Sequence, residues 1–501
     1  MITLILLALS GASLTFAYAP FSLWPLAIIA PAFAFRKIVA SSQHCFKLGW
    51  FFGLGWFGAG ISWVHVSIAD FGGLPIVVSI ALMLLLCGYL ALFPATAIWL
   101  SCRFSPKRLL PLSLPFFWLL LEWLRSWLLS GFPWLSLGYS QIDSPLSGWA
   151  PIIGETGMTL FVIVMASFLA MARNLKQCLS AIFVICITYG SGWVAKQHSW
   201  VTIKDTHEVA MIQGNIPQSL RWVPEQDEPT MQRYLALTEP FWQSDLIIWP
   251  EAAVPKLELL AFDYLTEVDA LSVEKNTALI TGIVNYNWES DEAWNNLIVL
   301  GKHDTEQDSA AYRYFHGNRY AKHQLLPIGE FVPFEDLLRP LAPLFDLPMS
   351  SFSRGDYQQA NLIANGIKLA PAICFEIAFP RQVSANVYRD TDMIITVSND
   401  AWFGRSHGPA QHLEIARMRA LEFGRPVVRA TNNGITAFID HKGEVTSALP
   451  QFEAAGISSP VQSTRGITPY QKFGDVLAWF IALLLLVVGY TLRTRERRIF
   501  S

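Results

Sequence analysis

Runs of apolar residues constrain this chain more than any other feature of its sequence. A membrane-spanning helix needs roughly 20 mostly apolar residues, and we identify eight runs of this kind, seven of them before residue 195. Only 15% of the 501 residues are charged, against about 25% in a typical soluble protein. The sequence therefore predicts a multi-pass membrane domain of eight spans. The runs centre on Ile2–Tyr18, Leu23–Phe35, Trp50–His65, Pro75–Leu100, Leu110–Leu129, Met158–Ala172, Cys178–Val194 and Val476–Leu492.

The basic residues predict how these spans are oriented. Cytoplasmic loops collect Lys and Arg, and here every second connection is basic, whereas the connections around Asp70 and over Gly131–Thr156 contain neither residue. We therefore expect both termini in the cytoplasm and the segment between spans seven and eight on the other side of the membrane. The basic residues are Arg36, Lys37, Lys47, Arg103, Lys107, Arg108, Arg173, Lys176, Arg493, Arg495, Arg497 and Arg498.

Between the last two spans the composition becomes that of an α/β domain. Short β-branched runs alternate with polar helical stretches and Gly, Pro or Asn turns. A helix is predicted over Pro409–Phe423, ended by Gly424 and Pro426. We expect a membrane domain over residues 1–196, an extracytoplasmic α/β domain over 207–455, an eighth span over 474–492 and a basic tail over 493–501. The expected strands are Val209–Gln213, Asp245–Trp249, Ala278–Val284, Leu297–Leu300, Leu369–Ile373, Met393–Val397, Val427–Ala430 and Ile435–Asp440.

Several classes of function are excluded by charge and motif content. The 36 Lys and Arg are balanced by 39 Asp and Glu, so a nucleic-acid-binding surface is not indicated. A net charge of -3 on so apolar a chain also excludes a largely disordered protein. The sequence contains no zinc-ligand spacing and no phosphate-binding glycine loop, so we expect neither a metal nor a cofactor.

Cys374 is the one cysteine of the predicted outer domain. The other five, Cys45, Cys87, Cys102, Cys178 and Cys186, lie in the predicted spans or at their cytoplasmic ends. A lone thiol outside the cytoplasm is either buried and inert or retained for its reactivity. Cys374 follows a predicted strand and precedes Phe375 and Glu376, and residues at such strand ends often carry function. Its position therefore favours reactivity.

Two other predicted strand ends carry residues that complement a thiol. Glu251 follows Asp245–Trp249 within a proline-rich turn, and Lys322 precedes a segment that contains Glu330. Acyl transfer at cysteine needs a base that takes the thiol proton and a cation that stabilises the oxyanion. Glu, Lys and Cys supply these three roles.

These segments resemble the signature of the nitrilase (carbon–nitrogen hydrolase) superfamily. Together with seven upstream spans and one downstream span, they make the whole chain similar to the bacterial apolipoprotein N-acyltransferase family. The segments that carry the resemblance are Met211–Asn215, Gln213–Gln218 leading to Trp222, Trp249–Glu251, Lys322 with Gly329–Pro333, and Cys374–Glu376.

The resemblance implies a fold and a set of residue roles. The outer domain would be an αββα sandwich in which Glu251 is the general base, Lys322 stabilises the oxyanion and Cys374 is the acylated nucleophile. Glu330 and Glu376 would be supporting carboxylates. Relatives carry Tyr where this chain has Phe375, so the resemblance implies an aromatic wall there and leaves a hydroxyl role open.

The resemblance also implies a reaction and its partners. An acyl chain passes from a phospholipid, typically phosphatidylethanolamine, to the cysteine as a thioester. The α-amine of a diacylglyceryl-cysteine lipoprotein then accepts it. Both substrates live in the bilayer, which implies a bacterial inner-membrane enzyme without a cofactor, whose catalytic domain faces the periplasm.

Apolar side chains near the nucleophile are expected to contact these lipid substrates. We single out Trp222, Trp402, Phe403, and Phe345 in the proline-rich loop Leu337–Met349. The alternative is that they pack into the core of the domain. In the membrane, Glu122 and Arg125 lie one helical turn apart; they either pair with each other or leave Arg125 to bind a lipid phosphate.

Two other functions remain compatible with the sequence. A membrane-anchored amidase or nitrilase would use the same three residues but hydrolyse a C–N bond with water. A transporter or channel would use the charged pair Glu122 and Arg125 within the membrane, but it would leave the three residues at the strand ends unexplained.

Overall fold

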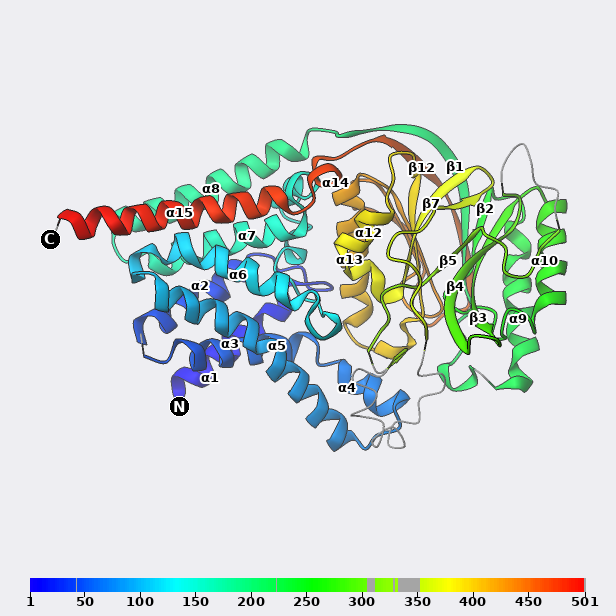
Figure 1. Cartoon of the computed structure of the whole chain (residues 1–501), viewed down its shortest axis with the longest axis horizontal. Coiled ribbons are helices and arrows are strands. Elements are labelled where there is room, and N and C mark those ends of the chain that lie inside the picture. Colours follow the sequence, from blue (N-terminus) through cyan, green and yellow to red (C-terminus); the bar gives the residue numbers. More distant parts are fainter. Residues whose placement is uncertain (42, 222, 304–310, 328, 332–351, 500–501) are drawn as a thin grey trace. The chain divides into compact units, whose positions relative to one another are not determined.

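The structure is a computed structural model that describes residues 1–41, 43–221, 223–303, 311–327, 329–331 and 352–499 (Figure 1). The chain forms two compact units, each with its own hydrophobic core. The first unit contains residues 1–69, 74–199 and 468–501, and the second contains residues 70–73 and 200–467. The first is built from apolar helices, and the second from strands and shorter helices.

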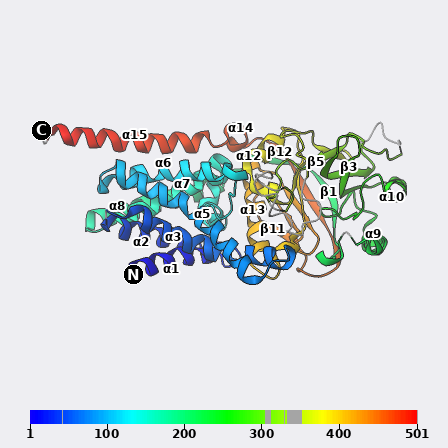
Figure 2. The ribbon, with the colours of Figure 1, turned by 60° about the horizontal axis from the view of Figure 1, so that its bottom comes forward.

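Helices lie over all eight apolar runs in the first unit. A helix satisfies its own backbone hydrogen bonds, which lipid cannot do, so apolar runs of this length form helices. The cores of α6, α7 and α15 meet at Leu119, Leu160 and Ala478, and Figure 2 shows α15 running beside α6. The helices are α1 (Ile2–Ser13), α2 (Leu26–Ser41), α3 (Cys45–Gly60), α4 (Val64–Val66), α5 (Ile76–Phe104), α6 (Leu110–Arg125), α7 (Ala150–Met171), α8 (Leu175–Lys196), α14 (Pro469–Phe473) and α15 (Val476–Ile499).

Fewer helices than eight are long and apolar enough to cross a membrane. Among the described residues four helices meet both criteria. A fifth span is added if the helices Cys45–Gly60 and Val64–Asp70, which are bent by 62° relative to each other, count as one. Helices α1, α2 and α6 have only 12, 16 and 16 residues. The described residues therefore support a membrane protein with four to five spans by length and composition, and they do not establish the predicted eight. The four unbent spans are Ile76–Phe104, Pro145–Met171, Leu175–Lys196 and Val476–Thr494.

The charged pair at the end of α6 has structural partners. Arg125 is buried and forms an ion pair with Glu122. Its guanidinium also donates a 2.8 Å hydrogen bond to the carbonyl of Trp134 and lies 5.5 Å from the ring of Phe57. Arg125 therefore ties the chain after α6 back to the helix, which favours the packing interpretation over binding of a lipid phosphate.

The second unit contains two sheets that face each other, with six described strands each. The core between them combines Met211 and Ile248 of one sheet with Leu369, Ile395 and Val428 of the other. The first sheet has the order β12 (Ala455–Gly466), β1 (Val201–Gln213), β2 (Leu246–Ile248), β3 (Ala278–Asn287), β4 (Glu292–Gly301), β5 (Arg319–Ala321). The second has the order β11 (Val445–Ala448), β10 (Ala437–Ile439), β9 (Val427–Thr431), β8 (Met393–Ser398), β7 (Ile367–Ile373), β6 (Leu362–Ala364).

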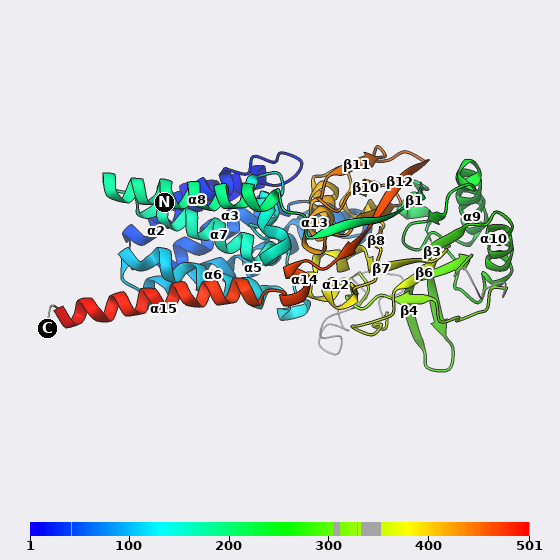
Figure 3. The same cartoon turned by 90° about the horizontal axis from the view of Figure 1, so that it is seen from above.

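Helices cover the outer faces of both sheets. On the first sheet, Met231 of α9 (Pro224–Thr238) and Leu265 of α10 (Phe262–Glu274) pack in one core with Ile247 and Leu279. On the second, α12 (Pro380–Asn386) contacts β7 and α13 (Gly408–Phe423) contacts β9 (Figure 3). This layering is the αββα sandwich that the sequence resemblance implied.

The parallel strands of each sheet end at one edge, and candidate catalytic side chains follow them there. Strands β1, β2 and β3 are parallel neighbours, as are β7, β8 and β9. The carboxyl ends of parallel strands meet at the same edge, and the turns that follow them carry functional side chains in many α/β proteins. Glu251 and Cys374 follow β2 and β7 in this way.

The sheets extend beyond the predicted strands. β1 begins at Val201 rather than Val209, and it pairs with β12 along its length, from Val201 opposite Gly466 to Gln213 opposite Ala455. The first half of β1 is largely exposed, so it lacks the apolar pattern that marks a buried strand. β6, β11 and β12 were not expected from the sequence, whereas β5 lies at the strand end predicted before Lys322.

Candidate active site

Three residues predicted from strand ends form one buried ionic cluster. The Lys322 ammonium lies 2.8 Å from Glu330 Oε1 and 3.4 Å from Glu251 Oε1. The three residues come from the turns after β2 and β5 and are all buried. A lysine buried so deeply is expected only where carboxylates compensate its charge. The cluster therefore holds one cation between two carboxylates.

Asn295 of β4 joins the two carboxylates from the side. Its Nδ2 donates to Glu251 Oε1 at 2.8 Å and to Glu330 Oε1 at 3.1 Å. The backbone N–H of Asn399 donates to Glu251 Oε2 at 3.1 Å. Burial opposes ionisation of Glu251, but the charges of Lys322 and Arg221 and these hydrogen bonds together hold the pKa of Glu251 below its ordinary value. Glu251 is therefore ionised at neutral pH, as a base must be.

Cys374 presents its thiol at the end of β7. Its φ is +53°, in the left-handed region that non-glycine residues seldom adopt and that often marks a functional site. The residue is only partly buried, unlike the cluster beside it. Burial and the negative charge of Glu251 raise the pKa of Cys374 to about 12, although the Lys322 cation and a hydrogen bond with Ser398 oppose this. The thiol is therefore neutral at rest and needs a base.

The buried carboxylate of Glu376 holds the turn that carries Cys374. It accepts hydrogen bonds from the backbone N–H groups of Ile373 and His323, both at 2.7 Å. It also accepts from Tyr320 at 3.0 Å and from Gln382 at 2.7 Å. Because Ile373 precedes Cys374 and His323 follows Lys322, one carboxylate fixes the spacing between the strand ends that carry the thiol and the ammonium.

The other predicted site residues differ in their burial and in their contacts. Phe375 is buried and packs edge-on against Phe379, with 4.9 Å between ring centroids. Trp402 and Phe403 are half-buried, and Phe403 packs against His412 at 5.8 Å. Both the core and the substrate-contact interpretations therefore retain support for these two. Trp222, Phe345 and the loop Leu337–Met349 lie outside the described residues.

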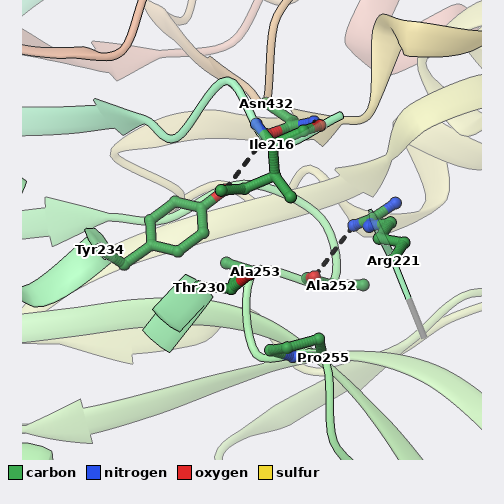
Figure 4. A pocket seen from close by; sticks show the side chains of 8 residues that line it. All are labelled: Ile216, Arg221, Thr230, Tyr234, Ala252, Ala253, Pro255 and Asn432. Atoms are coloured by element: carbon green, nitrogen blue, oxygen red, sulfur yellow. Dashed lines mark hydrogen bonds between the residues drawn. The ribbon is translucent and has the colours of Figure 1, made fainter. Parts of the chain in front are cut away.

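A small pocket lies beside the turn that contains Glu251 (Figure 4). Ala252, Tyr234, Asn432 and Arg221 line it, among other residues. One nitrogen of Arg221, Nη2, donates to the carbonyls of Glu251 at 2.5 Å and Ala252 at 2.9 Å. Arg221 thus braces the backbone of the predicted base and adds a second cation near it.

Several residues of the site were not found from the sequence. Asn295 lies in the middle of a strand, where nothing in the local sequence distinguishes it from a core amide. Ser398 is the last residue of β8 and Asp400 follows it closely, so the strand-end signal that identified Glu251 and Cys374 could have identified them too. Among the described residues, no cluster of three or more His, Cys, Asp or Glu could hold a metal ion.

The raised pKa of Cys374 predicts an unusual alkylation profile. A free thiol with a pKa of about 8.5 reaches full reactivity toward iodoacetamide above about pH 9.5. Since the Cys374 thiol titrates at about 12, we expect its alkylation rate to rise roughly tenfold per pH unit from pH 7 to 10 without levelling off. Peptide mass spectrometry of the full-length protein in detergent measures this, with a cysteine peptide as reference. A plateau near pH 8.5 would contradict the described electrostatics.

Comparisons with known proteins identify relatives of both units. A family model described as the apolipoprotein N-acyltransferase N-terminal domain matches residues 10–169, and the carbon-nitrogen hydrolase model matches residues 208–465. Proteins named apolipoprotein N-acyltransferase from Vibrio parahaemolyticus and Shewanella oneidensis are 46% and 45% identical to this chain. These alignments cover 98% and 99% of this chain and 97% and 96% of the relatives.

Solved structures give a weaker likeness. Nit3 of Saccharomyces cerevisiae, a member of branch 10 of the nitrilase superfamily, is 14% identical with a TM-score of 0.37. The match covers 52% of this chain and 91% of that chain.

Proposed function

This chain belongs to the apolipoprotein N-acyltransferase family, and we propose that it moves an acyl chain from a phospholipid to a lipoprotein amine through a thioester on Cys374. The observation that carries the mechanism is the buried cluster of Glu251, Lys322 and Glu330, in which the charges of Glu251 and Lys322 act on the Cys374 thiol. A carboxylate base, a fixed cation and an accessible thiol are the groups that acyl transfer requires.

In the first half of the reaction, Glu251 takes the proton of the Cys374 thiol as the sulfur attacks an ester carbonyl of the phospholipid. A C–S bond forms, and the carbonyl electrons become an oxyanion that Lys322 stabilises. The C–O bond then breaks, and the departing lysophospholipid oxygen takes the proton from Glu251. Cys374 is left as a thioester, and Glu251 is again ionised.

In the second half, the α-amine of the diacylglyceryl-cysteine attacks the thioester carbonyl. Glu251 takes a proton from the nitrogen, and Lys322 stabilises the second oxyanion. The C–S bond breaks as the amide forms, and the departing sulfur recovers the proton from Glu251. Each half uses the same base and the same cation, so one site suffices for two substrates that bind in turn.

The membrane unit is proposed to bring both substrates to this site. We propose eight spans with both termini in the cytoplasm, membrane segments over residues 1–196 and 474–492, and a catalytic domain over 207–455 in the periplasm. The basic connections of the sequence and the apolar helices support this arrangement.

Phosphatidylethanolamine is the proposed donor. Trp402 and Phe403, which are half-buried near the end of β8, are proposed to contact the acyl chain, together with Trp222 and Phe345.

Stepwise acylation tests this function. Full-length protein in detergent is incubated with phosphatidylethanolamine alone, and intact-mass spectrometry is expected to show one added acyl chain, absent from Cys374→Ala. Addition of a diacylglyceryl-cysteine peptide is expected to remove that mass and to produce a triacylated peptide. Acyl transfer that survives in Cys374→Ala would overturn the assignment of the nucleophile. Ammonia release from small amides without any acylated peptide would support the amidase instead.

A further inference from the structure

The Cys374 sulfur has a hydroxyl neighbour that the proposed mechanism does not use. Ser398, the last residue of β8, places its Oγ 3.4 Å from Cys374 Sγ. Among the described residues, Ser398 is the one whose side chain forms a hydrogen bond with the sulfur. Glu251 and Lys322 handle the proton and the oxyanion, and Lys322 acts on the sulfur through its charge, but among the described residues no hydrogen bond joins either side chain to the sulfur.

The same hydroxyl is held from its other side by a carboxylate. Ser398 Oγ lies 2.6 Å from Asp400 Oδ1, and Arg429 Nη2 donates to Asp400 Oδ2 at 2.7 Å. All three side chains are buried. Burial opposes ionisation of Asp400, but the charge of Arg429, the His412 ring and the Ser398 hydrogen bond together hold the pKa of Asp400 well below its ordinary value. Asp400 is therefore ionised and accepts a hydrogen bond from Ser398.

A hydroxyl has one proton and cannot serve both neighbours at once. While the sulfur is a neutral thiol, the charged Asp400 is the stronger and closer acceptor, so the Ser398 proton points to Asp400. The Ser398 lone pairs then face the thiol and can accept its S–H. When the sulfur becomes negative, it turns into an acceptor, and a rotation about the Cβ–Oγ bond delivers the Ser398 proton to it.

The backbone of Cys374 is fixed by the same group of side chains. His412 Nε2 lies 3.1 Å from the carbonyl oxygen of Cys374, and its Nδ1 lies 3.1 Å from Arg429 Nη2. Burial and the Arg429 charge lower the pKa of His412, although Asp400, whose Oδ1 lies 3.2 Å from His412 Nδ1, opposes this. The positive φ of Cys374 and the position of Ser398 are thus held by one buried network, which keeps the S···O distance short.

We propose that Ser398 is a further catalytic residue, whose hydroxyl donates a hydrogen bond to the Cys374 sulfur whenever that sulfur carries negative charge. This happens twice: when the thiol is deprotonated for attack on the phospholipid ester, and when the C–S bond of the thioester breaks and the electron pair returns to sulfur. No bond to Ser398 forms, and its proton stays on Oγ throughout. The inference rests on the proposed role of Cys374 as the acylated nucleophile.

Ser398→Ala tests the proposal with Thr396→Val as a matched control. Thr396 lies two residues earlier on β8, so it points to the same side of the strand. Its buried hydroxyl makes no hydrogen bond within the described structure. We expect Ser398→Ala to slow both acylation by phospholipid and discharge to the peptide by about tenfold or more, the effect of losing a hydrogen bond to a charged group. The KM for phospholipid should not change.

The alkylation rate of Cys374 is a measurement that a purely structural role of Ser398 would not change. On the rising limb of the pH profile, Ser398→Ala should lower the alkylation rate of Cys374 about tenfold at every pH, because the thiolate loses its donor. Ser398→Thr keeps a hydroxyl and should restore most of both losses, and Thr396→Val should stay within about twofold of wild type.

Each outcome separates this inference from the proposed function. If wild type forms no acyl-Cys374, the proposed function fails and Ser398 loses its role with it. If wild type is acylated and discharged normally but Ser398→Ala matches Thr396→Val in both assays, the inference alone is overturned. Equal losses in Ser398→Ala and Ser398→Thr would likewise overturn it, because the hydroxyl would not be the group that matters.

Discussion

Glu251→Gln is expected to reduce acyl transfer by about 10²–10⁴-fold, the usual contribution of a general base, while making Cys374 more reactive toward iodoacetamide. The two effects have opposite signs because Glu251 does two things to the thiol. Its carboxylate is the proposed acceptor of the thiol proton, and its negative charge raises the pKa of Cys374. Glutamine removes both, so the thiol ionises more readily in solution but has no base when the ester is bound.

The geometry of the cluster makes glutamine a mild replacement in other respects. Its amide oxygen can still accept from Asn295, which donates to Glu251 Oε1 at 2.8 Å. Single-turnover acylation and alkylation at pH 8 measure the two effects on the same preparation. Glu292→Gln, at an exposed position on β4, is the control and should alter neither. A fall in both rates would indicate a collapsed site, and unchanged acylation would show that another group is the base.

The strand ends of this site could be predicted because the physical signal is local. A buried strand is a short apolar run, and the polar residue that follows it stands out against that run. Glu251 after β2 and Cys374 after β7 were predicted in this way, and the structure brings both into the electrostatic field of Lys322. Strand-end reasoning was not applied to β8: Trp402 and Phe403 were selected after it as apolar side chains, whereas Ser398 hydrogen-bonds the sulfur and Asp400 hydrogen-bonds Ser398.

Contacts between distant segments could not be predicted from local patterns. Asn295 bridges Glu251 and Glu330 from the middle of β4, and only the register of β4 against its neighbours places it there. The first half of β1 is a strand because β12, more than 250 residues later, pairs with it. The length of an apolar run also fails to fix where a helix ends, since α6 stops at Arg125 although the predicted run continues to Leu129.

Lys322→Met is expected to damage both the stability and the activity of the protein. In the wild type, Glu251 has a lowered pKa, so its contribution to stability is present above its ordinary pKa of about 4.3 and is lost as the pH falls through the lower folded value. Without the ammonium, Glu251 and Glu330 are two buried carboxylates that keep hydrogen bonds from Asn295 and from the backbone N–H groups of Asn399 and Leu326 but lose the cation between them. Breaking a buried ion pair from one side costs about 3–5 kcal/mol.

The pH dependence of this loss has a definite sign. In Lys322→Met, the burial of Glu251 is no longer offset by the ammonium, so the pKa of Glu251 rises, and the variant is penalised at neutral pH and recovers as Glu251 is protonated on acidification. The gap between wild-type and variant melting temperatures in detergent should therefore be largest near pH 7.5 and narrow toward pH 5. Lys368→Met removes an exposed lysine paired with Asp390 and should change stability by about 1 kcal/mol or less.

Activity should fall further in Lys322→Met than the loss of a cation alone explains. Removing one oxyanion donor costs about 10²–10³-fold, and a Glu251 that has taken up a proton can no longer act as the base. Because both effects come from one substitution, they are not simply multiplied, and we expect a loss on the order of 10³-fold or more. Acylation measured at pH 7.5 on protein that is still folded isolates this effect from instability. A folded variant that keeps a tenth of the wild-type rate would show that Lys322 only holds the carboxylates apart, and the oxyanion would then need another donor.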